Sequence, residues 1–276
     1  MYEIVHKENL SDEVVFMKVK APLIARKRKA GQFVILRSNE EGERIPLTIV
    51  DSDPENGTIS IIFQVVGRST MEFSRLSEGD SFNDIVGPLG HPTEIKNYGT
   101  AVCVGGGIGT APIFPITKAL KEAGNTIYSI VGARTEKLLV LTDTMEALSD
   151  KFFITTDDGS KGHKGFVTDI LKDLLENDHV DIVFAIGPAI MMKFLSGLTK
   201  EYGVKTMVSL NAIMVDGTGM CGGCRVTVGN ETKFTCVDGP EFDGHKVDYD
   251  ELLKRLGMYK SQEERAKCRY KEENNG

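Results

Sequence analysis

The sequence predicts a β-barrel followed by an α/β domain and a small C-terminal domain rich in glycine and cysteine. Three observations predict this order. Short β-rich runs fill the first third of the chain, apolar runs then alternate with helical patterns, and three of the five cysteines lie between residues 221 and 236. A chain of 276 residues is long for one core. We expect the three parts to span 1–97, 98–206 and 207–276.

The first part contains four β-rich runs separated by turn residues. They cover 14–19, 32–36, 47–50 and 58–66. Short strands at this spacing are typical of a closed antiparallel barrel.

The second part alternates apolar strands with helical patterns. A run at 101–104 leads into a glycine turn and a helical stretch to Leu120, and further apolar runs lie at 127–131 and 182–186. This alternation is typical of βαβ units around a parallel sheet.

Two loops follow strands of that sheet and are candidates for nucleotide binding. The first is glycine-rich and precedes a helix, so its N–H groups can face a pyrophosphate, although a tight turn explains the pattern too. The second is Gly187-Pro188. Both lie at the sheet edge where ligands of open α/β sheets bind. The candidate residues are Gly105, Gly106, Gly107, Gly109, Thr110, Ala111, Gly187 and Pro188.

Three charged residues bear on the choice between NAD and NADP. Arg134 can meet a 2′-phosphate, whereas Asp157 and Asp158 can accept hydrogen bonds from ribose hydroxyls. Solvated loop charges are the alternative interpretation, so the residues alone leave the nucleotide open.

The strongest chemical signal is the run from Asp216 to Cys224, followed by Cys236. Plant-type [2Fe–2S] proteins use the spacing C-x4-C-x2-C with a distant fourth cysteine, and Asp216 occupies the first position of that spacing here. We interpret Asp216, Cys221, Cys224 and Cys236 as the ligands of a [2Fe–2S] cluster, because a carboxylate can bind iron.

Two other ligand sets stay open. Cys221, Cys224 and Cys236 could hold a structural zinc ion, with His245 as the fourth ligand. Alternatively, Asp216 is an ordinary loop acid, and Cys103 or Cys268 completes the cluster.

Two segments of the first part combine a cation with hydroxyl or backbone donors, which suits a flavin and its phosphates. A surface turn is the alternative for each. The segments are 44–48 and 65–70, and their candidate residues are Arg44, Pro46, Leu47, Thr48, Val65, Gly67, Arg68, Ser69 and Thr70.

Charge and hydropathy exclude several classes of protein. The net charge of −7 disfavours binding to nucleic acid. The N-terminus is charged from Glu3 onward, which argues against a targeting segment, and the longest uncharged apolar run, 101–116, is interrupted by glycines and prolines and predicts no membrane span. The odd cysteine count fits a reducing compartment, so we expect a cytoplasmic protein.

Taken in order, these motifs resemble the ferredoxin–NADP reductase superfamily. More narrowly, the chain is similar to two related groups: electron-transfer subunits of dihydroorotate dehydrogenase, and small subunits of NADH-dependent ferredoxin:NADP oxidoreductase, also called sulfide dehydrogenase. The resemblance covers nearly the whole chain. Its motifs are 44–48, 67–70, the Gly87–Gly90 turn, 105–112, Gly187-Pro188 and the cysteine run ending in Cys236-Val237-Asp238-Gly239-Pro240.

The resemblance implies an FAD-binding barrel, an NAD(P)-binding domain and a cluster domain. It implies that Pro46, Leu47 and Thr48 line the isoalloxazine, with the Thr48 hydroxyl near the reactive nitrogen as the one catalytic candidate, and that 67–70 holds the pyrophosphate. It also implies electron flow from NAD(H) through FAD and the cluster to a larger flavoprotein and iron–sulfur subunit, with ferredoxin reached through that subunit and bifurcation in the complex.

Three positions depart from the superfamily pattern. Arg44 stands one place before the usual flavin arginine, whose position holds Ile45, and Ile186 replaces the cysteine of a Cys-Gly-Pro loop. Asp216 replaces the first cluster cysteine, which resembles the NADH-dependent ferredoxin:NADP oxidoreductase branch and favours it. The alternatives are a dihydroorotate dehydrogenase subunit and, from another class, a zinc-stabilised nucleotide-binding regulatory module.

Overall fold

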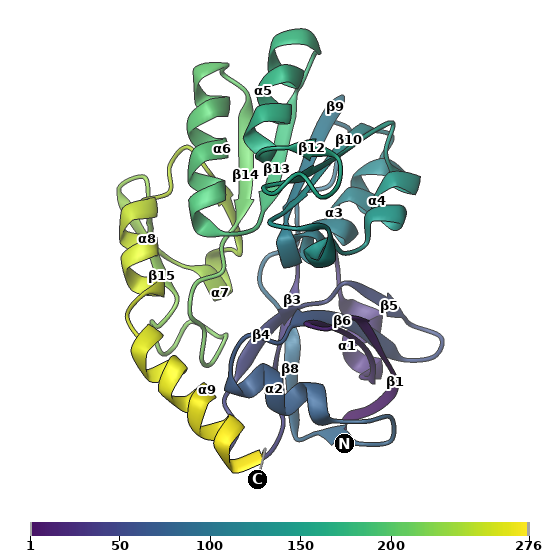
Figure 1. The fold of residues 1–276 in the computed structure, drawn as a ribbon, viewed down its shortest axis with the longest axis vertical. Helices are drawn as coiled ribbons and strands as arrows, with labels where there is room; N and C mark the ends of the chain where they lie inside the picture. Colours follow the sequence, from purple (N-terminus) through teal and green to yellow (C-terminus); the bar gives the residue numbers. More distant parts are fainter. Residues whose placement is uncertain (1, 275–276) are drawn as a thin grey trace.

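The computed structural model describes residues 2–274. A barrel lies at one end of the molecule and an α/β part at the other, and the C-terminal segment runs along the side of both (Figure 1). The predicted combination of an antiparallel barrel with a parallel sheet is confirmed. None of the helices within residues 2–274 has the length and apolar character needed to cross a membrane.

The barrel consists of two antiparallel sheets around one apolar core. Their strand orders are β5-β6-β2-β1-β7 and β4-β3-β8. Phe63, Phe73 and Phe82 pack edge to face in this core, and Phe73 anchors helix α2 there. The elements are β1 (Tyr2–Ser11), β2 (Val14–Lys20), α1 (Pro22–Lys27), β3 (Phe33–Arg37), β4 (Ile45–Thr48), β5 (Asp51–Asp53), β6 (Thr58–Gln64), α2 (Arg68–Arg75), β7 (Ser81–Phe82) and β8 (Asp84–Leu89).

The barrel strands differ from the sequence prediction at two places. The sequence pattern does not predict β1, whose side chains are mostly exposed and polar, and this strand forms by antiparallel pairing along β2. The strand expected at 47–50 lies instead at Ile45–Thr48, with Pro46 inside it. β4 is an edge strand, where a residue without an N–H is tolerated.

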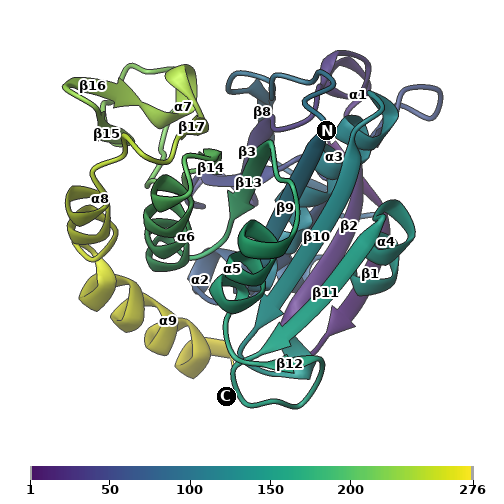
Figure 2. The ribbon, with the colours of Figure 1, turned by 90° about the horizontal axis from the view of Figure 1, so that it is seen from above.

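The α/β part contains a seven-stranded sheet in the order β12-β11-β10-β9-β13-β14-β17, parallel from β12 to β14. Helices α5 and α6 cover one face, and α3 and α4 cover the other (Figure 2). Its elements are β9 (Thr100–Gly106), η1 (Gly107–Gly109), α3 (Thr110–Glu122), β10 (Thr126–Ala133), η2 (Glu136–Leu138), α4 (Thr142–Leu148), β11 (Lys151–Thr156), β12 (His163–Lys164), α5 (Val167–Asn177), β13 (Ile182–Ile186), α6 (Ala189–Glu201) and β14 (Lys205–Ser209).

The C-terminal segment completes both other parts. Its strand β17 pairs antiparallel with β14 and so covers the edge of the parallel sheet, which would otherwise leave backbone groups unpaired. The stretch expected to be a polar tail is helix α9 as far as Asn274, and it returns to the barrel beside α2 (Figure 1). The elements are β15 (Arg225–Val228), β16 (Glu231–Phe234), α7 (Thr235–Asp238), β17 (Glu241–Asp243), α8 (Tyr249–Leu256) and α9 (Lys260–Asn274).

One apolar core crosses all three parts of the molecule. It contains Phe33 and Ile35 of the barrel, Val183 of the sheet, and Cys224 and Cys236 of the C-terminal segment. The cysteine-rich segment is therefore packed against the barrel and the sheet together. The predicted boundaries at 97/98 and 206/207 stay predictions.

Candidate functional site: a cleft between barrel and sheet and a cysteine loop

A cleft of about 2370 Å³ lies between the barrel and the carboxyl edge of the parallel sheet. It joins β4 of the barrel to the glycine-rich turn after β9 and to the loop after β13. Segments far apart in the sequence thus face one space. The predicted site residues that line it are Pro46, Leu47, Thr48, Thr70, Gly106, Gly107, Gly109, Arg134, Asp157, Gly187 and Pro188.

The two sheet-edge loops pack closely against each other, and the Met191 side chain lies against Gly106 and Gly187. A Cβ atom at Gly109 would lie 2.3 Å from the carbonyl oxygen of Ile186, and one at Gly106 would lie 2.4 Å from Sδ of Met191. Gly107 has φ +55° and open space beside it. The glycines therefore let both loops share one edge and leave backbone exposed to the cleft.

Thr110 and Ala111, two other predicted nucleotide residues, have fully buried side chains. The Thr110 hydroxyl donates to the carbonyl oxygen of Gly107 at 3.0 Å and holds the turn. Ala111 packs with Val14 and Ile62 of the barrel. These side chains shape the loop and join the two parts, and Gly105 likewise lies against Thr110.

The residues predicted to contact the ribose have different surroundings. Arg134 and Asp157 both line the cleft. The Asp158 carboxylate instead accepts hydrogen bonds from the hydroxyl and the N–H of Ser160, at 2.6 and 2.9 Å, and these bonds lower its pKa. Asp158 thus closes a turn, whereas Asp157 is free to face a ligand.

The edge strand β4 presents Thr48 to the cleft. Thr48 pairs with Phe33 across the sheet, is half-buried, and its hydroxyl forms no hydrogen bond within residues 2–274. Its neighbours Pro46 and Leu47 line the same wall. An unpaired hydroxyl on an apolar wall suits a ligand with a polar ring edge.

The 65–70 motif lies at the start of α2. The Thr70 hydroxyl oxygen accepts the N–H groups of Val66 and Gly67, at 3.0 and 3.1 Å, so it caps the helix. Val65 is held by backbone, because its N–H donates to the carbonyl of Glu13 at 2.7 Å. Gly67 is the N-cap residue.

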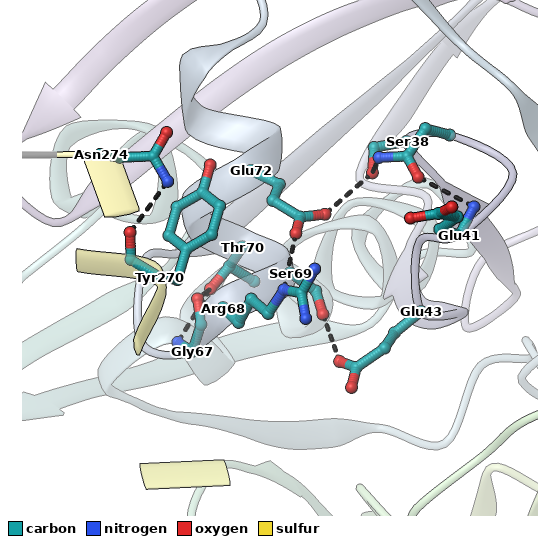
Figure 3. A network of polar contacts seen from close by, with 11 residues as sticks. Ser38, Glu41, Glu43, Gly67, Arg68, Ser69, Thr70, Glu72, Tyr270 and Asn274 are labelled. Atoms are coloured by element: carbon teal, nitrogen blue, oxygen red, sulfur yellow. Dashed lines mark hydrogen bonds and ion pairs between the residues drawn. The ribbon is translucent and has the colours of Figure 1, made fainter. Parts of the chain in front are cut away.

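Two carboxylates engage the other donors of this motif (Figure 3). The Ser69 hydroxyl donates to Oε2 of Glu43 at 2.5 Å. Arg68 Nε donates to Oε1 of Glu72 at 2.9 Å, and this bond raises the pKa of Arg68. The start of α2 therefore already binds an anion of its own chain.

Arg44 lies beside Glu43 in the connection before β4. Its Nε is the one buried side-chain nitrogen or oxygen without a hydrogen-bond partner among residues 2–274. A buried guanidinium N–H without an acceptor is costly in a folded protein. A bound ligand could supply the acceptor that the Arg44 Nε–H lacks.

The four predicted cluster ligands lie in two groups. Cys224 and Cys236 are buried, with their Sγ atoms 3.2 Å apart. Asp216 and Cys221 lie on the preceding loop, where the Asp216 carboxylate accepts the N–H groups of Thr218 and Cys221 at 2.8 and 2.7 Å. Over residues 2–274, no three His, Cys, Asp or Glu side chains converge in a metal-binding arrangement.

The surroundings of the buried Cys236 disfavour its thiolate form. Burial and, after it, the hydrogen bond with Cys224 raise the pKa of Cys236 to about 12. The Thr218 N–H and then the Cys221 N–H lower the pKa of Asp216, which stays a carboxylate. A bound metal would supply the positive charge that two adjoining thiolates require.

The alternative ligands lie elsewhere. Cys103 packs in the core on the α3 and α4 face of the sheet, whereas Cys224 and Cys236 belong to the core on the other face, and burial raises the pKa of Cys103 to about 12. Cys268 is exposed on α9. His245 Nε2 lies 3.0 Å from the Thr199 hydroxyl. None of the three joins the cysteine loop.

Several cleft residues escape a sequence prediction. Phe166 and Phe194, which are 61% and 63% exposed, line the α5 and α6 side of the cleft, and Leu10 and Glu13 reach it from the β1–β2 hairpin. The only local sequence signal for them is that Phe166 follows Gly165 at the start of a helical pattern. Glu43 carries no signal, because its partner Ser69 is 26 residues away.

Family models match two parts of the chain. Residues 103–197 match an oxidoreductase NAD-binding domain, and residues 211–248 match the iron–sulfur cluster binding domain of dihydroorotate dehydrogenase B. A ferredoxin NADP+ reductase from Neisseria gonorrhoeae, solved with FAD and NADP, has the same fold at 17% identity, with a TM-score of 0.61 over 73% of this chain and 90% of that one.

Two similarities extend over nearly the whole chain. A Thermotoga maritima protein named as a homolog of the dihydroorotate dehydrogenase B (NAD(+)) electron-transfer subunit is 52% identical over 95% of this chain and 92% of its own. A chain in a solved structure of NADH-dependent reduced ferredoxin-NADP oxidoreductase, studied for flavin-based electron bifurcation, is 50% identical with a TM-score of 0.93 and 98% coverage of both chains. The predicted resemblance is confirmed, and the chain belongs to the family of electron-transfer subunits of dihydroorotate dehydrogenase B, within the ferredoxin–NADP reductase fold.

Proposed function

We propose that this chain is an oxidoreductase subunit that passes electrons between NAD(H) and a partner flavoprotein through FAD and a [2Fe–2S] cluster. One observation carries the proposal. The loop with Asp216 and Cys221 packs directly on strand β3, and β3 pairs with β4, the strand that would line the flavin, so the two proposed redox sites lie on neighbouring strands.

The contact between loop and barrel is close. A Cβ atom on Gly217 would lie 2.6 Å from Cδ1 of Ile35 and 2.7 Å from Cδ1 of Leu89. Ile35 is 1% exposed and pairs with Pro46 of β4. Residues paired directly across an antiparallel sheet point to the same face, so the cysteine loop lies beside the wall that would hold the isoalloxazine.

Side chains in the cleft and at the adjoining start of α2 fit a flavin dinucleotide. Thr48 would donate to the isoalloxazine edge, Ser69 and the start of α2 would hold the pyrophosphate, and the orphaned Arg44 Nε would gain an acceptor. FAD, when bound, supplies the conversion of a two-electron hydride into one-electron transfers, and the cluster carries single electrons.

The nicotinamide nucleotide would occupy the sheet side of the same cleft. Gly106, Gly107 and Gly187 expose backbone at the edge, where N–H groups bind pyrophosphate. Asp157 would accept the ribose hydroxyls, which favours NAD over NADP because a 2′-phosphate beside a carboxylate is repelled. Arg134 lines the same region, and its positive charge would attract a 2′-phosphate, so the site would accept either nucleotide.

The cluster would be held by Asp216, Cys221, Cys224 and Cys236. The donor set fits, because three thiolates and one carboxylate match iron in charge and the buried Cys224 and Cys236 are already 3.2 Å apart. The glycine turns of the loop would let N–H groups approach the sulfur atoms, as the Gly223 N–H approaches Cys221 Sγ at 3.4 Å.

The partner we propose is a larger flavoprotein and iron–sulfur subunit, with ferredoxin reached through it and electron bifurcation in the complex. The solved relative at 50% identity comes from an NADH-dependent reduced ferredoxin-NADP oxidoreductase studied for electron bifurcation, and Asp216 in place of the first cluster cysteine resembles that branch. The 52% identical Thermotoga maritima protein is named as a homolog of the dihydroorotate dehydrogenase B subunit, so identity alone does not separate the two branches. The dihydroorotate enzyme is the second candidate. The five free cysteines favour the cytoplasm as the location.

The test is the visible spectrum of the anaerobically purified chain, with iron, acid-labile sulfide, zinc and flavin analysis. We expect flavin and [2Fe–2S] absorption that bleaches with NADH. A colourless protein with stoichiometric zinc would support the regulatory module instead. Co-purification with tagged chain then distinguishes a ferredoxin-reducing partner from a dihydroorotate dehydrogenase.

A further inference from the structure

The proposed pyrophosphate site carries an acidic side chain that competes with its ligand. This inference rests on the proposed flavin site at the start of α2. There the Ser69 hydroxyl donates its single hydrogen to Glu43 at 2.5 Å (Figure 3). A hydroxyl has one hydrogen to donate, so Ser69 cannot bind Glu43 and a phosphate oxygen at once.

The two carboxylates at this site differ in how they are held. Glu72 belongs to α2 itself, four residues after Arg68, has a side chain only 13% exposed, and also accepts from the Ser38 hydroxyl at 3.1 Å. Glu43 comes from the 38–44 connection between β3 and β4 and is exposed, and Ser69 is the one hydrogen-bond partner of its carboxylate within residues 2–274. The Glu72 carboxylate is therefore held in place by its own helix, whereas the Glu43 carboxylate can move away from Ser69 by breaking one hydrogen bond.

The position of Glu43 is that of an anion at a helix N-terminus. Ser69 is the second residue of α2, where unpaired N–H groups and the helix dipole attract negative charge. Glu43 also acts electrostatically on the neighbouring Arg68 guanidinium. The carboxylate therefore satisfies the same groups that a pyrophosphate would satisfy.

We propose that Glu43 is an affinity-determining residue for FAD, because its carboxylate accepts the one hydrogen of Ser69 that the pyrophosphate would also need. Its negative charge stays close to the bound phosphates and weakens their binding. The adjoining Arg44, with its buried unpartnered Nε, gives the same connection a group that attracts the ligand. Glu43 and Arg44 thus oppose each other in setting how tightly FAD is held.

The experiment measures binding of FAD and of riboflavin to the full-length flavin-free chain, by quenching of flavin fluorescence. Riboflavin has the same ring without phosphates. We expect Glu43→Gln to tighten FAD binding by about tenfold, the effect of removing one nearby like charge, and to leave riboflavin binding unchanged. The gain should shrink as salt is raised, because screening weakens the repulsion.

Glu41→Gln is the matched control, since Glu41 belongs to the same connection and its carboxylate forms no hydrogen bond or ion pair within residues 2–274. It should leave FAD binding unchanged. Glu43→Ala is the second variant and should tighten FAD binding in the same direction. Equal FAD affinity of wild type, Glu43→Gln and Glu43→Ala would overturn the role of Glu43, as would an equal gain for riboflavin or for Glu41→Gln. Failure of every variant to bind FAD would overturn the proposed flavin site and this inference with it.

Discussion

The Arg75 guanidinium of α2 lies 4.9 Å from the centre of the Tyr270 ring of α9. This contact ties the last helix, which has no buried residue, to the helix that begins with the proposed pyrophosphate motif. The C-terminal segment therefore leaves the cysteine loop, crosses the side of the molecule and contacts helix α2 of the barrel (Figure 1).

We expect Tyr270→Ala to lower the free energy of unfolding by about 0.5–1 kcal/mol, because a cation–π contact at a partly exposed site is lost. The flavin should also dissociate faster, since α2 loses this contact. Urea unfolding and FAD release measure both effects. Tyr270→Phe keeps the ring and should match wild type, and a Phe variant as weak as the Ala variant would refute the cation–π role.

Gly217→Ala should destabilise the cysteine loop and reduce iron content. Gly217 has φ +76°, and a Cβ would lie 2.6 Å from Ile35. Gly229→Ala is the matched control, because Gly229 also has positive φ, +64°, but open space around it. Both variants should lose about 1 kcal/mol from the backbone conformation. Only Gly217→Ala should lose more, and equal losses in urea unfolding would contradict the packing of the loop on the barrel.

Asp216→Cys should retain a [2Fe–2S] cluster and change its reduction potential, because a soft thiolate replaces a hard oxygen donor. Redox titration followed by electron paramagnetic resonance measures the change. An unchanged potential together with an unchanged resonance spectrum would remove Asp216 from the ligands.

Asp157→Asn should affect nucleotide binding, whereas Asp158→Asn should affect the stability of the turn at Ser160. Asp157 lines the cleft, so its variant should raise the KM for NADH by roughly tenfold through the loss of a charge-assisted hydrogen bond. Asp158 binds Ser160, so its variant should act mainly on stability. Steady-state kinetics and thermal unfolding of both variants test this, and the reverse pattern would assign the ribose contact to Asp158.

Glu241 predicts a pH dependence of stability. Burial raises the pKa of Glu241 to about 7, against an ordinary value near 4.5, although its carboxylate accepts a hydrogen bond from Thr93 at 2.5 Å. The folded chain therefore holds this proton more tightly than the unfolded chain. Stability should fall as pH rises from about 4.5 to about 7, by on the order of 2–3 kcal/mol, and change no further above that range.

Glu241→Gln should abolish that fall and be more stable than wild type at pH 8, as measured by urea unfolding at pH 5 and pH 8. Glu94→Gln is the control, because hydrogen bonding from Lys96 lowers the pKa of Glu94 and its titration lies below this window. A wild-type stability that is flat between pH 5 and pH 8 would contradict the burial of a titrating Glu241.

Local sequence patterns were enough to predict the order of the parts and the apolar strands β2, β3, β6, β9, β10 and β13. Alternating burial in β2 and fully apolar runs such as β13 follow from side-chain periodicity, which a sequence displays directly. The spacing of Cys221, Cys224 and Cys236 and the glycines after β9 likewise carry their chemistry within a few residues. Polar β1 and helix α9 lack such a pattern and form through contacts with β2 and α2.

By itself, then, the sequence determined the barrel, the parallel sheet, the glycine loops and the identity of the candidate cluster ligands. Only the tertiary structure decided that Cys103 faces away from the other cysteines and that Glu43 meets Ser69. The physical reason is range. Periodicity and turn chemistry act between neighbours, whereas the partner of a side chain such as Glu241, bonded to Thr93 across 148 residues, is chosen by packing of the whole chain.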